Sequence, residues 1–144
     1  MPALSQSLTF TVNNTSTVLL NYPNTGTTAL TYLTNKVKGD GYFGNSDGFH
    51  TVQVQTNNFV GKIELQGTLE SDPGSNDWFN VELGTNNYSV DTTGLVNPTN
   101  ITFVQYTTPT TIIKSYNFTG NFVWVRSKIS NFTEGSITSI KYNH

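Results

Sequence analysis

The chain has 144 residues, with seven lysine and arginine residues against nine aspartate and glutamate residues and a formal net charge of −2. Charged residues make up only 11% of it and cysteine is absent, which excludes disulfide bonds, thiolate metal sites and a cysteine nucleophile. The few basic residues are scattered and form no stripe that could follow a phosphate backbone, so we expect no nucleic-acid binding.

In place of charge, the chain is rich in Thr, Asn, Ser and Gly, and 12% of its residues are aromatic. Thr, Tyr, Phe and Val favour strands, whereas Asn and Gly favour turns. The composition therefore predicts an all-β protein. The length favours one domain over residues 1–144 with a hydrophobic core of its own.

The N-terminal stretch, MPALSQSLTF, has neither a basic region nor an apolar run. It lacks the pattern of a secretory signal, and no window of the sequence reaches transmembrane length. We therefore expect a protein that is made in the cytoplasm and does not insert into a membrane. Leu8, Phe10 and Val12 then alternate with polar residues, which predicts a first strand.

Residues 29–39, ALTYLTNKVKG, leave two alternatives open. Leu30, Leu33 and Val37 fit one face of a short helix that Gly39 would cap. The same stretch also fits a strand through Leu30, Tyr32 and Thr34. The sequence thus predicts at most one short helix.

The next stretch, GDGYFGNSDGFH, predicts an ordered loop whose glycines permit positive φ angles. It partly matches a calcium-binding loop. However, Phe43 and Val54 stand where that loop needs acidic ligands. We expect neither a metal site nor a cofactor.

Polar–apolar alternation recurs through the rest of the chain and predicts several more strands. In residues 62–70, one face carries Ile63, Leu65, Gly67 and Leu69, and the other, expected to be solvated, carries Lys62, Glu64, Gln66, Thr68 and Glu70. Turn signals separate the strands at SDPGSND, ELGTNNY, TTGLVNPTN and TTPTT, and NFTEGSI separates the last two. This spacing predicts an antiparallel β-sandwich or a jelly-roll-like barrel.

No group of residues has the pattern of a catalytic site. His50 stands alone at the mouth of a predicted strand, without a nearby nucleophile or orienting partner. Asp72 and Asp77 flank a turn, which is typical of turn-capping carboxylates and not of a glycosidase pair. We therefore expect no catalytic residues and no enzymatic activity.

Two sets of residues are candidates for binding. Exposed aromatic side chains can stack on sugar rings, so Tyr42, Phe43, Trp78 and Tyr88 form a candidate glycan-binding set. In residues 121–130, Val123, Val125 and Ile129 share the core face of a strand, while Phe122, Trp124, Arg126 and Lys128 share the other. That second face begins aromatic and ends basic, so Phe122, Trp124 and Arg126 form a candidate interface with another subunit.

Several of these motifs resemble small structural proteins of tailed bacteriophages, particularly T4-like phages of marine bacteria. The motifs are Gly67-Thr68-Leu69, Asp77-Trp78-Phe79, Trp124-Val125-Arg126 and Asn131-Phe132-Thr133 followed by Gly135. The resemblance covers about residue 40 to the C-terminal end and consists of packing motifs. It implies a β-sandwich virion component, such as a neck, tail, fibre or decoration protein, released by host lysis.

These observations lead to one functional hypothesis and one alternative. We expect a non-enzymatic virion protein that associates with itself, for example as a trimer, and with other virion proteins. The alternative is a carbohydrate-binding module or receptor-binding tip that contacts a cell-surface glycan.

Overall fold

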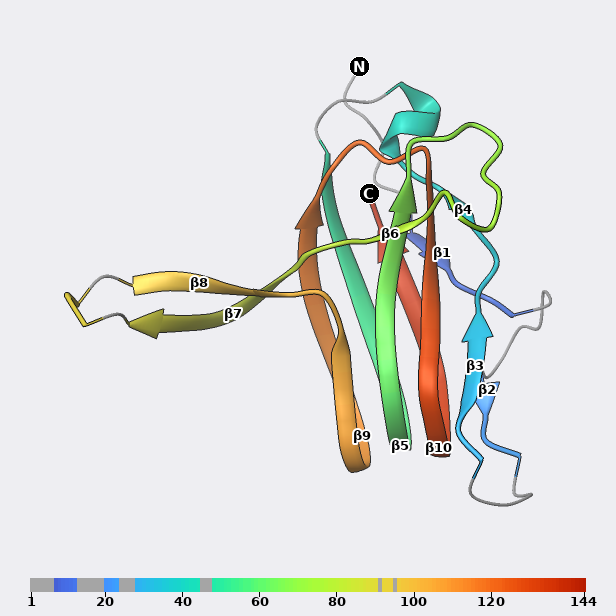
Figure 1. Ribbon diagram of the computed structural model, residues 1–144, viewed down its shortest axis with the longest axis vertical. Coiled ribbons are helices and arrows are strands. Elements are labelled where there is room, and N and C mark those ends of the chain that lie inside the picture. The colour runs from blue at the N-terminus through green and yellow to red at the C-terminus, as the bar shows by residue number, and fades with distance from the viewer. Residues whose placement is uncertain (1–6, 13–19, 24–27, 45–47, 91, 95) are drawn as a thin grey trace.

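A computed structural model describes residues 7–12, 20–23, 28–44, 48–90, 92–94 and 96–144; for residues 7, 85–90 and 96–100 it describes the backbone alone. The described residues form an antiparallel all-β structure, which confirms the predicted all-β class (Figure 1).

The strands in the described residues belong to one sheet of ten, with β1-β10-β5-β9-β7-β8 as its main order. In chain order they are β1 (Ser7–Thr9), β2 (Leu20–Asn21), β3 (Leu30–Leu33), β4 (Val37–Lys38), β5 (Phe49–Thr68), β6 (Phe79–Asn80), β7 (Leu83–Val90), β8 (Val96–Ile101), β9 (Val104–Thr119) and β10 (Trp124–Asn143). The one described helix is a short 3-10 turn, η1 (Asp40–Phe43). The helical alternative for residues 29–39 is wrong, because β3 and β4 occupy that stretch and pair with β10.

Three long strands, β5, β9 and β10, bend near their middles and fold back together (Figure 1). β10 pairs with β5 along both of its halves, from Trp124 opposite Thr68 to Asn143 opposite Thr51. The sheet therefore folds over onto itself, so that its two halves face each other across the core. One continuous folded sheet forms both layers. The sequence pattern had predicted separate short strands instead.

The bend is built in part from residues that the sequence pattern assigned to connections, such as Asn131 and Gly135. Asn58 in β5 and Asn131 in β10 both have φ of 50°, and Gly135 has φ of 78°. The pairing register shifts at the same level, between Thr56 and Phe59 and around Glu134. Bulges of this kind bend a strand without ending its ladder. The predicted breaks at NFTEGSI and TTPTT are thus wrong as connections, because both stretches lie inside continuous strands.

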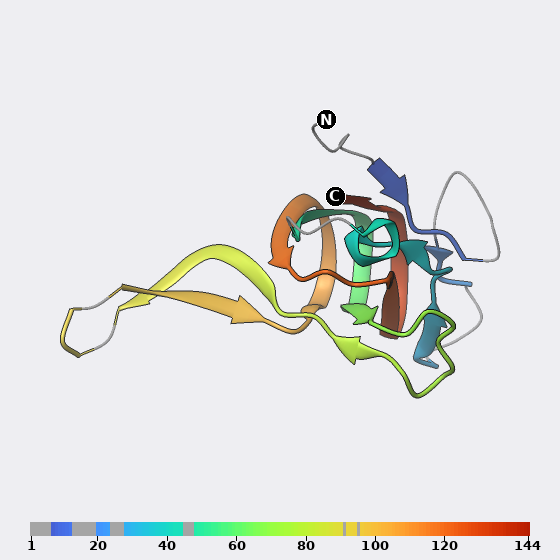
Figure 2. The same ribbon diagram turned by 90° about the horizontal axis from the view of Figure 1, so that it is seen from above.

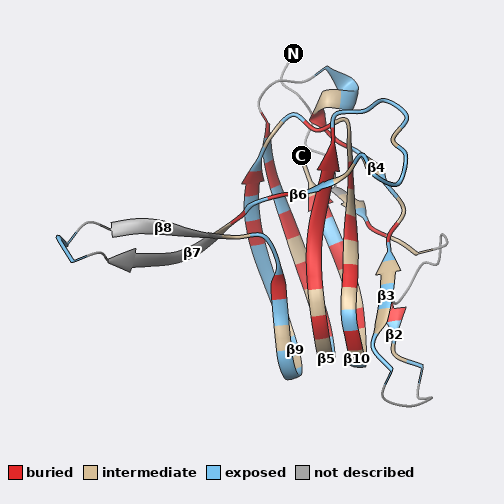
Figure 3. Cartoon of the chain, in the orientation of Figure 1, coloured by how far each residue is buried: buried red, intermediate tan, exposed pale blue. Residues whose placement is uncertain are grey.

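The core lies between the two halves of the folded sheet (Figure 3). Of the core face expected in residues 62–70, Ile63 and Leu65 are buried at 4% and 2% exposure, as predicted, but Leu69 is not part of the core. Leu69 is 66% exposed, because β5 ends at Thr68 before it. The opposite face was expected to be solvated, but Glu64 and Gln66 are buried there. Here β5 lies between β10 and β6, Arg126 of β10 donates to Gln66, and the ammonium group of Lys62 lies 3.1 Å from the Glu64 carboxylate.

The β7–β8 hairpin projects from the folded sheet as an arm (Figures 1 and 2). Its strands pair with each other from Leu83 opposite Ile101 to Val90 opposite Val96. Within the described residues, its one register pair with the body joins Gly84 to Asn117 of β9. The arm is therefore held to the body at its base alone.

The bend provides a direct test of this architecture. A methyl group at Gly135, where φ is positive, would collide with the backbone carbonyl of Asn58. We expect Gly135→Ala to lower the free energy of unfolding by about 2–5 kcal/mol, from backbone strain and overpacking together. Gly44 has a similar φ of 71° with open space around its missing side chain. Gly44→Ala should cost only about 1–2 kcal/mol. Equal losses in a urea titration would contradict the close packing at the bend.

Candidate functional site

The structure gathers most of the candidate binding residues on one surface. We call it the aromatic–cationic surface. It consists of Lys36, Lys38, Tyr42, Phe43, Trp78, Trp124 and Arg126, and it lies on the outer face of the sheet half that contains the N-terminal part of β10. Two residues of the candidate interface and three of the candidate glycan-binding set therefore belong to the same surface.

Trp124 is the centre of the first part of this surface. Its ring lies 5.0 Å from that of Tyr42, and the Tyr42 ring lies 5.4 Å from that of Phe43. The ammonium groups of Lys36 and Lys38 lie 4.5 Å from the ring centres of Trp124 and Tyr42, respectively. The indole N–H of Trp124 donates to the carbonyl of Ser71 at 3.0 Å. These contacts fix an exposed aromatic group with positive charge above it.

Arg126 forms the second part, together with Trp78. The guanidinium carbon lies 4.2 Å from the centre of the Trp78 ring, and Nε donates to Oε1 of Gln66 at 2.9 Å. Gln66 in turn donates from Nε2 to Oδ1 of Asn80 at 3.1 Å. Partial burial lowers the pKa of Arg126. Arg126 therefore has partners within its own chain, and a second subunit is not needed to explain it.

Two candidate residues do not belong to this surface. Phe122 was expected at an interface, but it is only 8% exposed and lies in the core. Its ring fills the space left by two glycines, since a methyl group at Gly67 would lie 2.8 Å from the ring and one at Gly120 would overlap it. The side chain of Tyr88, in β7, lies outside the described residues.

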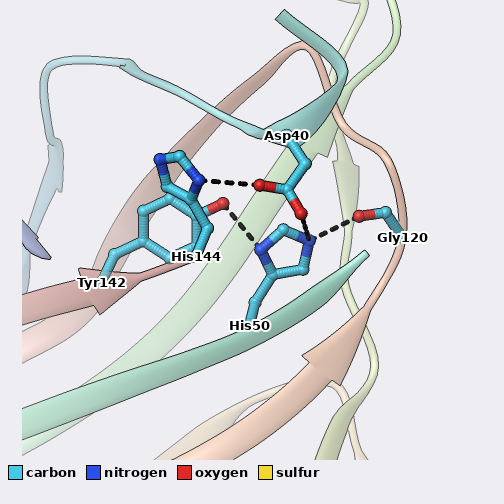
Figure 4. A network of polar contacts seen from close by, with 5 residues as sticks. All are labelled: Asp40, His50, Gly120, Tyr142 and His144. Carbon is cyan, nitrogen blue, oxygen red and sulfur yellow. Dashed lines mark hydrogen bonds and ion pairs between the residues drawn. The ribbon is translucent and has the colours of Figure 1, made fainter. Parts of the chain in front are cut away.

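A second group of polar residues is buried at the open end of the folded sheet (Figure 4). We call it the histidine cluster. Asp40 comes from η1, His50 from β5, Tyr142 from β10, and His144 follows β10. Nδ1 of His144 lies 2.7 Å from Oδ1 of Asp40, while Nε2 of His50 lies 4.0 Å from Oδ2 of the same carboxylate.

The contacts of His50 define its hydrogen-bonding pattern. Nε2 lies 2.5 Å from the carbonyl oxygen of Gly120, which can only accept, so Nε2 carries a hydrogen. Nδ1 lies 2.8 Å from the hydroxyl of Tyr142. Burial, with a further contribution from the Asp40 carboxylate, raises the pKa of Tyr142. The hydroxyl therefore stays protonated, and opposite the neutral tautomer of His50 with its hydrogen on Nε2 it donates to Nδ1.

A carboxylate, an imidazole and a hydroxyl in this order suggest a nucleophilic site, but the geometry does not support one. A nucleophile must be reachable and must lose its proton readily. The Tyr142 side chain is 0% exposed and its pKa is raised, which is the opposite of activation. The cluster instead ties η1, the start of β5 and the chain after β10 together.

The sequence pattern did not reveal this cluster, because it joins Asp40 and His50 to Tyr142 and His144, which lie 92 or more residues further along the chain. One local signal was present: Asp40 stands between two glycines. Methyl groups at Gly39 and Gly41 would collide with the carbonyls of Phe122 and Asn121, so the flanking glycines let η1 approach that segment closely. The φ angle of Gly39 is −94°, so this glycine is explained by the close packing and not by a positive φ angle.

Within the described part of the chain, no group of three or more His, Cys, Asp or Glu residues is placed to hold a metal ion. The described residues also include no helix with the length and apolarity needed to span a bilayer. No family model, curated protein sequence or solved structure matches the chain.

The intrachain partners of Arg126 lead to a prediction that differs from that of a subunit interface. We expect Arg126→Ala to lower the free energy of unfolding of the monomer by about 1–2 kcal/mol, because it removes a cation–π contact and a hydrogen bond. Lys128, two residues along the same strand face, serves as the control, and Lys128→Ala should change stability by less than about 0.5 kcal/mol. A normal denaturant midpoint for Arg126→Ala would contradict the assignment.

The Tyr142 hydroxyl predicts two separable effects. At neutral pH, Tyr142→Phe should cost about 1–3 kcal/mol, because Nδ1 of His50 loses its donor in a buried site. Above about pH 10 the unfolded chain ionises this tyrosine while the folded chain still resists, so stability falls as pH rises. Tyr142→Phe has no hydroxyl to ionise here, so above about pH 10 its free energy of unfolding should fall less steeply than that of the wild type, by about 1.4 kcal/mol per pH unit. Denaturant titrations from pH 7 to 11 measure both, and an identical alkaline slope in the two proteins would refute the second effect.

Proposed function

We propose that this chain is a non-enzymatic structural protein that acts by self-association, as a component of a tailed-phage virion together with other virion proteins. The observation that carries the self-association is the β7–β8 arm. The resemblance of the packing motifs to small phage structural proteins supports the choice of a virion as the assembly.

The arm is hard to explain as part of an isolated subunit. A two-stranded hairpin is marginally stable in water, and a third strand or a packed face is normally needed. The arm projects from the body, and Gly84 opposite Asn117 is its one register pair with the body within the described residues (Figure 2). A neighbouring copy that covers the arm would provide the missing contacts.

β9 offers a surface of the matching kind. One side of this strand pairs with β5, and on the other side the described residues show pairing only at Asn117. Ile113 in this strand is 63% exposed. An edge with unpaired N–H and C=O groups is a template for a strand from another chain. Pro109 interrupts the edge near its bend, which limits uncontrolled pairing.

The composition also favours permanent packing against similar surfaces. With charged residues at 11% of the chain, little like-charge repulsion opposes the approach of a second copy. Interface cores are depleted in charge and enriched in aromatic residues, as is this sequence. The measured mass of the oligomer gives the number of copies that this packing joins.

Removal of the arm tests the proposal. Gly84 and Asn100 are register partners, so an Asn-Gly turn can join them in place of residues 85–99. We expect the wild-type chain to form a defined oligomer and the shortened chain to be a folded monomer. Light scattering behind a sizing column, over a hundredfold range of concentration, measures the mass, and circular dichroism checks the fold.

Arg126→Ala is the matched control, because Arg126 has its partners within the chain and should leave the oligomer intact. A wild-type chain that stays monomeric at every concentration and binds no virion protein would overturn the proposal. Retention of the oligomer without the arm would overturn the role of the arm.

A further inference from the structure

A cleft of about 470 Å³ opens where the arm leaves the body. It lies between the segment that joins β6 to β7 and the end of β9. It is lined by Phe79, Asn80, Val81, Glu82, Gly84, Asn117, Phe118, Thr119 and Phe122. Its volume falls within the range of about 300–1,000 Å³ that is typical of small-molecule sites.

One wall of the cleft is an aromatic platform. Phe79 is 46% exposed, although it lies beside the core, and its ring centre is 5.6 Å from that of Phe122. The backbone of Phe79 is fixed by pairing with Gly67 of β5. Phe122 and Phe118 are buried behind it. The cleft therefore contains the Phe79 ring, which is fixed in position and partly exposed, and the flat apolar face of a ligand can stack on it.

The rim of the cleft carries two oriented amides. Oδ1 of Asn80 accepts a hydrogen bond from Gln66, and Oδ1 of Asn117 accepts one from the Thr51 hydroxyl at 2.9 Å. With its oxygen held, each amide presents N–H donors that have no partner in the described part of the chain. The hydroxyl of Thr119 and the carboxylate of Glu82 add further polar groups to the rim.

The charge of the lining narrows the class of ligand. Glu82 is the one charged side chain among the lining residues, so the cleft disfavours anions. An aromatic platform beside amide donors and one carboxylate acceptor complements a ring with an apolar C–H face and several hydroxyl groups. We infer that this cleft binds a neutral hexopyranose unit of a glycan, with its C–H face on Phe79 and its hydroxyls on Asn80, Asn117 and Glu82.

This inference goes beyond the proposed structural function and places sugar contact away from the aromatic–cationic surface. Of the four sequence-based candidates, Tyr42, Phe43 and Trp78 do not line the cleft, and the side chain of Tyr88 lies outside the described residues. Phe79 follows Trp78 directly in the chain, and β6 turns it towards the cleft.

The binding test uses methyl glycosides of glucose, galactose, mannose and N-acetylglucosamine, with glucuronic acid as an anionic comparison. Saturation-transfer NMR detects binding to the wild-type chain, and titration gives the dissociation constant. We expect at least one neutral glycoside to bind and Phe79→Ala to weaken it at least about tenfold. Phe103, another exposed phenylalanine, lies outside the cleft, so Phe103→Ala should bind normally.

A second variant separates recognition from folding. Asn117→Asp keeps an oxygen that accepts from Thr51 but removes the N–H donors, so it should weaken binding while leaving the unfolding midpoint unchanged. Absence of binding by every neutral glycoside at millimolar concentration would overturn the inference. So would a preference for glucuronic acid, or full binding by Phe79→Ala. The oligomeric mass is read independently, so failure here and failure of the self-association proposal are distinguishable.

Discussion

The whole structure depends on three strands that bend at the same level. Asn58 and Asn131 adopt positive φ angles in neighbouring strands, and Gly135 allows the chain to pass close to the carbonyl of Asn58. Because β5 and β10 stay paired through the bend, the sheet closes over its own apolar face without a connecting loop. The core, the buried cluster at the open end and the aromatic–cationic surface outside all follow from this fold-over.

The bend also separates two kinds of polar chemistry. Inside, the histidine cluster links η1 to the ends of β5 and β10 through hydrogen bonds that are shielded from water. Outside, cations rest on aromatic rings along the N-terminal half of β10. Buried polar groups specify how segments join, because an unpaired one costs free energy, whereas exposed groups remain available to other molecules.

Local patterning predicted much of the fold, but not how its parts are joined. Alternation correctly placed a strand at Ile63 and Leu65, since a half-buried pleat demands it. It could not show that NFTEGSI bends a strand, because Asn and Gly serve bulges and loops alike. The burial of Glu64 depends on β5 being central, which is set by partners distant in sequence. For the same reason, His50 looked isolated although Tyr142 lies against it.

The position of β10 in the sheet has a consequence for the order of folding. β1, β2, β3 and β4 all pair with β10, and β10 also pairs along β5. A ribosome makes the chain from its N-terminus, so these early strands have no partner until the last described strand has emerged. The sheet therefore closes only after synthesis of β10, and until then the apolar faces of β5 and β9 depend on dilution or chaperones for protection.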